Sequence, residues 1–192
     1  TCLTCATGLA SSNSSSSCVT CTGGRYQSEA EATSYNCKTC NAGLATPNRN
    51  TSCVQCVSGT YQNLSAADSY NCKSCSMGQT TVNATTACAV CVQGKYQEAS
   101  ESTVYGCKTC VKGQAAANGQ SACVSCTGGR YQELNLATSY NCKTCGPGKY
   151  SSDSNSSCTN CPSGEYQIET AASDYTCLTC ATGLASSNSS SS

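Results

Sequence analysis

The chain contains no histidine, phenylalanine or tryptophan, one methionine and three prolines. Without histidine there is no ordinary catalytic triad and no side chain whose unperturbed charge changes near neutral pH. No apolar run reaches the roughly 20 residues that a bilayer-spanning helix needs. Ten acidic and ten basic residues balance one another and form no basic stripe, which argues against nucleic acid as a partner. We therefore expect no enzymatic activity, no cofactor, no metal and no membrane span in this segment.

Cysteine is the residue type that the chain has in excess, with 22 in 192 residues. So few leucine, isoleucine and valine residues are typical of disordered chains. This density of cysteine is instead typical of disulfide scaffolds, in which cross-links replace the apolar core that small modules lack. The composition therefore predicts a folded, disulfide-rich protein.

The cysteines form a strict repeat. All of them belong to Cys-x-x-Cys pairs, and the steps between pairs alternate between 16 and 19 residues, a period of 35. A fixed period between about 20 and 50 residues is typical of a solenoid or linear array. Each period contains the run Cys-x-x-Cys-x-x-Gly-x-Tyr-Gln, which first occurs at residues 18–27. We expect five repeats, at 1–36, 37–71, 72–106, 107–141 and 142–176.

A second, longer repeat is visible at the two ends. Residues 176–192 match residues 1–17 letter for letter, although the 35-residue repeats differ from one another at many positions. The identity predicts a block of 175 residues that recurs in tandem, with 177–192 opening the next block. No signal peptide is visible, because Thr1 already lies within a repeat. We expect the chain to be a window of a longer protein in which a cysteine follows Ser192.

The pattern predicts a small disulfide-rich repeat fold with short β-strands and turns, little helix and no conventional core. The best strand candidates are residues 25–27 and 34–36 and their copies, with a single helical turn between them at 28–32. A glycine three residues after each pair, first Gly8 and Gly24, predicts a turn with positive φ. Strands of roughly 17–20 Å would give an elongated rod on the order of 100 Å.

Three kinds of chemistry use Cys-x-x-Cys pairs. Cys37, Cys40, Cys53 and Cys56 have nearly the spacing of a zinc ribbon. Eleven redox motifs in one chain make no mechanistic sense, and no βαβ pattern surrounds them. Against zinc stand the missing histidine, the strict array and the glycosylation motifs, which indicate an oxidising compartment. The pattern favours structural disulfides.

Two disulfide pairings remain open, since a pair bonded to itself would form a small strained ring. The rival scheme joins alternate cysteines, as in Cys2–Cys18 with Cys5–Cys21. The favoured scheme joins the second cysteine of each pair to the first of the next and leaves Cys2 and Cys180 to bond with neighbouring blocks. Its bonds are Cys5–Cys18, Cys21–Cys37, Cys40–Cys53, Cys56–Cys72, Cys75–Cys88, Cys91–Cys107, Cys110–Cys123, Cys126–Cys142, Cys145–Cys158 and Cys161–Cys177.

The run from Cys21 through Gly24 and Tyr26 to the pair Cys37 and Cys40 resembles the cysteine-rich repeats of growth-factor receptors and ephrin receptors. It is also similar to modules of tumour-necrosis-factor receptors. Long arrays of such units resemble surface proteins of protists and mastigoneme-type stalk proteins. The resemblance implies an extracellular scaffold and no particular ligand. The strict period of 35 residues departs from the receptors and favours an architectural use.

Other repeated positions allow two interpretations each. Tyrosines at Tyr26 and Tyr35 and their copies either form a ligand-binding ladder or, as we favour, cover the disulfides. Lysines within the pairs, such as Lys38, either pair with acidic residues or keep the protein soluble. Six asparagines begin Asn-x-Ser/Thr motifs and either accept N-linked glycans or simply form turns: Asn13, Asn50, Asn63, Asn83, Asn155 and Asn188.

These observations predict a structural subunit of an extracellular filament, stalk or surface coat, carrying covalent glycans and assembling with copies of itself. The alternative is a cell-surface ectodomain that binds a ligand or acts as an antigen.

Overall fold

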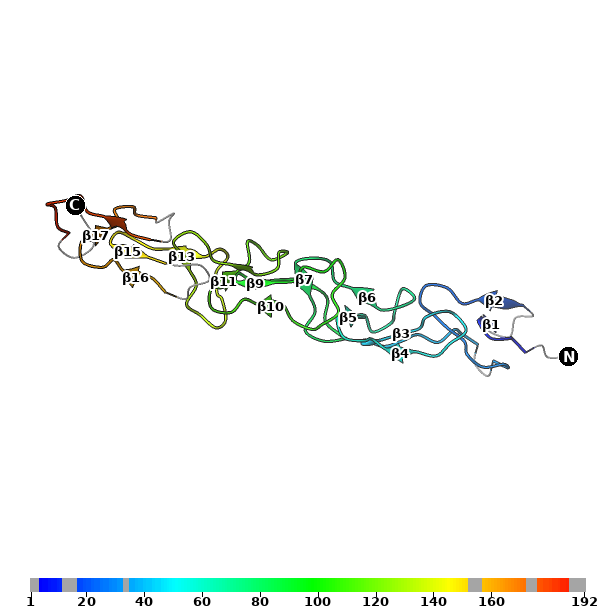
Figure 1. Cartoon of the computed structure of the whole chain (residues 1–192). Coiled ribbons are helices and arrows are strands. Elements are labelled where there is room, and N and C mark those ends of the chain that lie inside the picture. Colours follow the sequence, from blue (N-terminus) through cyan, green and yellow to red (C-terminus); the bar gives the residue numbers. More distant parts are fainter. Residues whose placement is uncertain (1–3, 12–16, 33–34, 152–156, 172–175, 187–192) are drawn as a thin grey trace. The chain divides into compact units, whose positions relative to one another are not determined.

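The structure is a computed structural model that describes residues 4–11, 17–32, 35–151, 157–171 and 176–186. The chain divides into two compact units, one formed by Thr1–Ala89 with Ala99–Gly106 and the other by Val90–Glu98 with Cys107–Ser192. The described residues contain short strands and turns and no helix. Within these ranges each strand pairs with one other strand only, so no sheet there closes or grows beyond two strands (Figure 1).

Ten disulfides between described cysteines divide the chain into loops of two alternating sizes, and each joins the second cysteine of one pair to the first cysteine of the next. Each loop of this size stabilises the fold by about 3 kcal/mol through the restricted unfolded chain. Five short loops, with a separation of 13 residues, are closed by Cys5–Cys18, Cys40–Cys53, Cys75–Cys88, Cys110–Cys123 and Cys145–Cys158. Five long loops, with a separation of 16 residues, are closed by Cys21–Cys37, Cys56–Cys72, Cys91–Cys107, Cys126–Cys142 and Cys161–Cys177.

Each short loop carries a hairpin whose second strand lies in the cysteine pair that ends the loop. In the first of them Leu9 is opposite Thr20 and Ala10 is opposite Val19. The strands of this class are β1 Leu9–Ser11 with β2 Cys18–Thr20, β3 Leu44–Ala45 with β4 Val54–Gln55, β7 Gln79–Thr80 with β8 Ala89–Val90, β11 Gln114–Ala115 with β12 Val124–Ser125, and β15 Lys149–Tyr150 with β16 Thr159–Asn160.

Each long loop carries a second kind of hairpin, built by the tyrosine of the Gly-x-Tyr-Gln run. Tyr61 is opposite Lys73, and in the first long loop Tyr26 forms a single bridge with Lys38. The strands of this class are β5 Thr60–Tyr61 with β6 Lys73–Ser74, β9 Lys95–Tyr96 with β10 Lys108–Thr109, β13 Arg130–Tyr131 with β14 Lys143–Thr144, and β17 Glu165–Tyr166 with β18 Leu178–Thr179.

The predicted strand at residues 25–27 is confirmed by its copies, but the one at 34–36 is wrong where its copies are described. Residues 69–71 and 139–141 form no strand, because Asn71 and Asn141 both have a φ of 64°. A left-handed residue cannot continue a β-strand. Residues 28–32 form no helical turn either. The strands have two or three residues, far shorter than the expected 17–20 Å.

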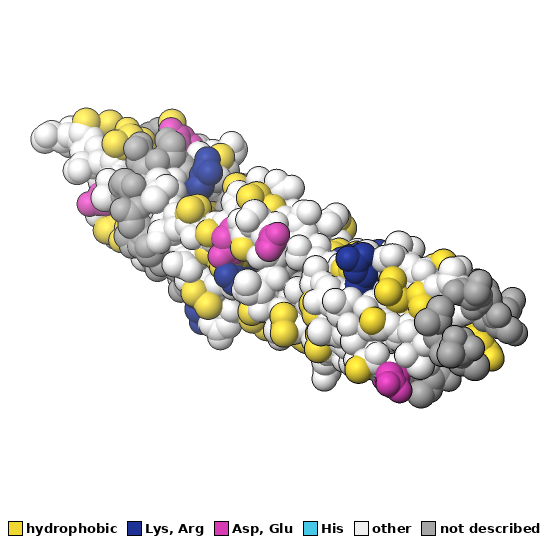
Figure 2. Space-filling view, turned by 90° about the vertical axis from the view of Figure 1, so that its right-hand side faces the viewer, with side chains coloured by type: hydrophobic (Ala, Val, Ile, Leu, Met, Phe, Trp, Pro, Cys, Tyr) yellow, Lys and Arg dark blue, Asp and Glu magenta, His cyan; other side chains and the backbone are white. Residues whose placement is uncertain are grey.

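The interior is made of sulfur, small side chains and amides. The second cysteine of each described pair is buried, except Cys180, and alanines such as Ala10, Ala45 and Ala115 are buried as well. Leucines, valines and the isoleucine are mostly exposed; on the face in Figure 2 apolar side chains form small separate groups between polar ones. The largest fully buried side chains are Gln27 and Gln62. Disulfides and amide hydrogen bonds therefore hold the fold together.

Candidate functional site: the junctions between loops

Gln62 joins three loops. Its side-chain Nε2 donates to the carbonyl oxygens of Asn41 at 3.0 Å and Leu44 at 3.4 Å in the preceding short loop. Its main-chain carbonyl accepts from Gly43 in the same loop, at 2.7 Å. Its main-chain nitrogen donates to Ala84 in the following short loop, at 2.8 Å. One buried residue in a long loop thus holds the preceding and the following short loop against it.

The same side-chain arrangement recurs in further copies of the run. Gln132 donates to Val111 at 2.9 Å and Gln114 at 3.3 Å, and Gln167 donates to Gly146 and Lys149, both at 3.1 Å. The glutamines share an exposed fraction of 7% or less: Gln27, Gln62, Gln97, Gln132 and Gln167. Because a buried amide without partners would cost about 1–3 kcal/mol, these positions strongly favour glutamine.

The sequence contains the signal for this role, since the glutamine never varies among the five runs. The cysteine, glycine and tyrosine of the run have roles that their side chains predict, whereas the pattern predicts none for the glutamine. Its partners are main-chain carbonyls 18 and 21 residues away. Every residue has a main-chain carbonyl, so the sequence does not show which residues accept these hydrogen bonds.

Glycines make the second junction contact. The predicted positive φ is confirmed at 77° for Gly8, 83° for Gly59 and 82° for Gly94. A Cβ on Gly59 would collide with the carbonyl oxygen of Ser102, and one on Gly94 would collide with that of Ala137. Only glycine lets the main chain of the next repeat approach this closely.

Tyrosines make the third contact. The hydroxyl of Tyr70 donates to the carbonyl of Cys21 at 2.9 Å, and that of Tyr140 donates to Cys91 at 3.3 Å. Tyr96 and Tyr140 also pack against the small cluster that contains Cys110. These contacts support the packing interpretation of the tyrosines, because the hydroxyls and rings serve the junctions between repeats.

The lysines of the pairs form ion pairs, one of the two alternatives. Lys38 is 2.6 Å from Glu29, Lys73 is 3.4 Å from Asp68 and Lys108 is 2.7 Å from Glu98. Lys143 pairs with Glu133 in the same way. The hydrogen bond from Lys108 lowers the pKa of Glu98, and the one from Lys143 lowers the pKa of Glu133. All four pairs are exposed to solvent, so each contributes little to stability.

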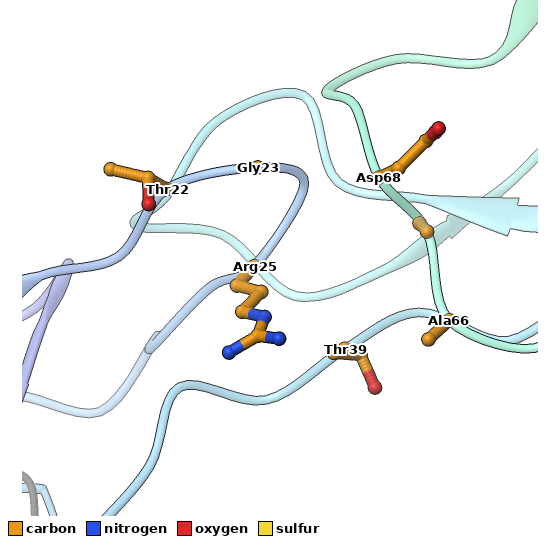
Figure 3. Close-up of a pocket in the computed structure, with 7 residues that line it drawn as sticks. Thr22, Gly23, Arg25, Thr39, Ala66 and Asp68 are labelled. Carbon is orange, nitrogen blue, oxygen red and sulfur yellow. The ribbon is translucent and has the colours of Figure 1, made fainter.

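One junction of the first unit contains a pocket of about 370 Å³. It is lined by Thr22, Gly23, Arg25, Thr39, Ala66, Ala67 and Asp68. In Figure 3 the Asp68 carboxylate points away from the Arg25 guanidinium, and Asp68 pairs with Lys73 instead. Arg25 forms no ion pair within the described residues, so its guanidinium is the one charged donor group that the pocket offers to an acidic ligand.

Three of the six glycosylation motifs lie on described residues, and Asn50, Asn63 and Asn83 are all exposed. Asn83 also forms a turn, because its Oδ1 accepts bonds from the main-chain nitrogen and the hydroxyl of Thr85, both at 2.9 Å. Asn48 and Asn118 form the same turn without a motif. Asn13, Asn155 and Asn188 lie outside the described residues.

Two cysteines stand apart from the ten disulfides. Cys180 is a half-buried free thiol, and Cys2 lies outside the described residues. Twenty cysteines that a zinc array would need are bonded to one another. Over the same described ranges no three metal-ligating side chains come together. The bond of Cys180 to a neighbouring block stays a prediction.

Comparison with known families agrees with this geometry. Residues 43–87 match the family described as tyrosine-protein kinase ephrin type A/B receptor-like. A search of curated proteins with the chain gives no match. The family match and the regular disulfides identify a cysteine-rich receptor-like repeat, a class that is typically non-catalytic, and they point to an extracellular environment. The described residues include no helix able to span a membrane.

Proposed function

We propose that this chain is a structural segment of an extracellular filament, stalk or surface coat, glycosylated on its loops and assembling with copies of itself. The observation that carries the proposal is the repeated junction. The glutamine and glycine contacts recur with the 35-residue period, and a tyrosine contact occurs once in each unit, at Tyr70 and at Tyr140. An array of this kind lengthens by adding repeats and needs no new type of contact.

The lack of a large apolar core among the described residues also supports the proposal. Disulfide loops keep each repeat folded by restricting its unfolded chain, so a repeat depends only on its neighbours and on an oxidising environment. Many leucines and valines are exposed, and on the face in Figure 2 the apolar side chains form small separate groups. Such a material suits a load-bearing or covering role outside the cell.

Electron microscopy of the native material tests this function. We expect fibres or coats with an axial repeat set by the five-repeat block of 175 residues. Isolated monomers without any assembly in the native material contradict the proposal.

A second function, ligand binding by a cell-surface ectodomain, is favoured by the Arg25 pocket. Basic residues occupy the place of Arg25 in two further long loops, at Lys95 and Arg130, but the residues in the place of Asp68 there are Thr138 and Ser173. The combination of Arg25 and Asp68 therefore occurs at one junction. An acidic sugar or peptide side chain is the ligand class that a free guanidinium binds. A glycan-array screen of the wild-type chain against Arg25→Ala tests it: binding that Arg25→Ala removes supports this function, and no binding contradicts it.

A further inference from the structure

The tyrosine before the cysteine pair of the third long loop differs from its copies. Tyr70 and Tyr140 are half-buried and donate their hydroxyls to main-chain carbonyls 49 residues earlier. Tyr105 occupies the same place, is 38% exposed, and makes no hydrogen bond to any residue that the structure describes. The carbonyl that such a bond would use, that of Cys56, lies in the same compact unit. The exposure of Tyr105 is therefore a property of its own repeat.

Two valines lie beside Tyr105 and are exposed as well. Val104 precedes it in the chain and is 41% exposed, and Val82 is 66% exposed. The main-chain nitrogen of Gly106 donates to the carbonyl of Thr81 at 3.0 Å, which holds the segment of Val104 and Tyr105 next to the segment of Val82. We call Val82, Val104 and Tyr105 the valine–tyrosine patch.

The patch occurs together with a glycosylation motif. The turn asparagines of the second and fourth repeats, Asn48 and Asn118, begin no acceptor motif, whereas Asn83 in the third repeat does. The motif at Asn50 starts two residues further on, where its Oδ1 would be 2.1 Å from a Cβ on Gly8. In the second and fourth repeats other residues take the places of the two valines: Pro47 with Ser69, and Ala117 with Ser139. Among these three repeats, the turn asparagine that begins a motif is thus the one beside the two valines and the unbonded tyrosine.

The turn leaves available the atom to which a glycan is linked. Asn83 Oδ1 accepts three hydrogen bonds from Thr85 and Thr86, each at 2.9 Å, whereas Asn83 Nδ2 makes none within the described ranges. In glycan transfer, Nδ2 bonds to the anomeric carbon of a pyrophosphate-activated sugar, displaces the pyrophosphate and loses one proton. The turn is therefore compatible with a linked glycan, because Oδ1 keeps its hydrogen bonds.

A tyrosine in the place of Tyr105 lies beside this turn. In the fourth repeat the hydroxyl of Tyr140 is 3.0 Å from the position that a Cβ on Gly119 would occupy, and Gly119 follows its turn asparagine as Ala84 follows Asn83. A sugar linked to Asn83 therefore starts close to the valine–tyrosine patch. Because the sugar is tethered, its effective concentration at the patch is on the order of mM, so weak contacts are enough to hold it there.

We propose that the first sugar of a glycan on Asn83 packs on the valine–tyrosine patch and covers it. One face of an N-acetylhexosamine presents C–H groups, which suit the negative face of an aromatic ring, and its N-acetyl methyl group is apolar and suits the valines. The hydroxyl groups of the sugar stay in water. This inference rests on the proposed function, in which the loops are glycosylated, and it names the surface that one glycan covers.

Nitration of tyrosine side chains tests the contact, because a covered ring reacts more slowly. The 192-residue chain is secreted from a eukaryotic host, trimmed to the first sugar with an endoglycosidase, nitrated in its folded state and analysed by peptide mass spectrometry. In Thr85→Val, which lacks the motif, we expect Tyr105 to be nitrated roughly fivefold faster than in the wild-type chain. This is the ratio for a ring that is covered about four-fifths of the time.

The chain offers a matched control and an internal reference for this measurement. Thr86→Val removes an equivalent hydrogen bond to Asn83 Oδ1 but keeps the motif, so Tyr105 should react as slowly as in the wild-type chain. Tyr35, which is 61% exposed, should react at the same rate in all three proteins.

Nuclear magnetic resonance of the trimmed glycoprotein gives a second measurement that does not depend on reactivity. The ring current of Tyr105 should shift protons of one N-acetylhexosamine upfield. Tyr105→Leu should abolish this shift and leave the signals of the other sugars unchanged.

Three results overturn the inference. The first is a secreted protein without a glycan on Asn83, and the second is equal nitration of Tyr105 in the wild-type chain and Thr85→Val. The third is an upfield shift that persists in Tyr105→Leu, since another ring then causes it. Each of these results leaves the filament function standing if the native material forms fibres with the block repeat. Absence of such fibres overturns the filament function and leaves the contact between the sugar and Tyr105 standing.

Discussion

The hydroxyl of Tyr70 donates a hydrogen bond of 2.9 Å to the carbonyl of Cys21, across 49 residues of sequence. Tyr70→Phe removes this bond and keeps the ring, so we expect the junction to lose about 1 kcal/mol. Amide hydrogen exchange measures such local losses, and it should accelerate around Cys21. Tyr35→Phe is the matched control, because Tyr35 is 61% exposed. Amide hydrogen exchange in the Tyr35→Phe variant should equal that of the wild-type chain. Equal effects of the two variants contradict this role of Tyr70.

Alanine substitutions at Gly94 and Gly164 distinguish the cost of a steric collision with a neighbouring main chain from the cost of backbone strain. Both have positive φ, 82° and 85°, so an alanine at either position costs about 1–2 kcal/mol in strain. Only at Gly94 does the new Cβ also collide with main chain, at the carbonyl oxygen of Ala137. We expect Gly94→Ala to lower the denaturant midpoint clearly more than Gly164→Ala does. Equal midpoints mean that Gly94 is required for its φ alone.

Gln62 should tolerate no acidic replacement. Gln62→Glu places a carboxylate against the carbonyl oxygens of Asn41 and Leu44, which now receive hydrogen bonds. We expect a loss of roughly 3 kcal/mol or more at neutral pH, because a buried charge loses its hydration and the carbonyls lose their donor. Gln55→Glu makes the same chemical change on an exposed residue of β4 and should be nearly neutral. Chemical denaturation with intact disulfides compares the two.

Side-chain patterns in the sequence predict the parts of this fold that side chains determine. Cysteine spacing predicts the alternating loops, and the fixed glycines predict the turns with positive φ. The pattern does not predict the strand partner of Tyr61. Residues 69–71, the copy of the strand candidate at 34–36, form no strand because Asn71 has a φ of 64°, and Tyr61 pairs with Lys73 instead. The role of Gln62 was missed for a related reason: its partners are main-chain atoms, which are the same at every position.

The ion pairs of the long loops should give a small loss of stability in acid. Hydrogen bonds from Lys108 and Lys143 lower the pKa of Glu98 and of Glu133. A carboxylate with a lowered pKa contributes stability above its unfolded pKa of about 4.3, and this contribution is lost as the pH falls through the folded pKa.

We therefore expect a flat denaturant midpoint from neutral pH down to about pH 5 and a decline below about pH 4. Lys143→Met removes the partner of Glu133 and should make the decline shallower. Lys112→Met is the control, since Lys112 is exposed and forms none of the four ion pairs. An unchanged acid profile in Lys143→Met shows that the pair with Glu133 is not the cause.

The turn at Asn83 allows glycosylation to be separated from folding. Thr85 and Thr86 each donate a hydroxyl to Asn83 Oδ1 at 2.9 Å, but only Thr85 completes the acceptor motif. Thr85→Val and Thr86→Val therefore remove equivalent hydrogen bonds, and only Thr85→Val should remove a glycan. Secretion from a eukaryotic host, followed by mass spectrometry before and after enzymatic removal of N-glycans, measures the difference.

The converse change adds a motif to a turn that has none. Asn118 accepts from the main-chain nitrogen of Gln120 at 2.8 Å, as Asn83 accepts from Thr85 at 2.9 Å. Gln120→Thr completes the motif and keeps this main-chain donor, so the secreted protein should gain one N-glycan with little change in stability. Gln120→Val keeps the same main-chain bond without the hydroxyl and should gain none. If Asn83 carries no glycan in the wild-type chain and Asn118 carries none in Gln120→Thr, these exposed turns are not acceptors, and the sugar coat of the proposed filament must be attached elsewhere.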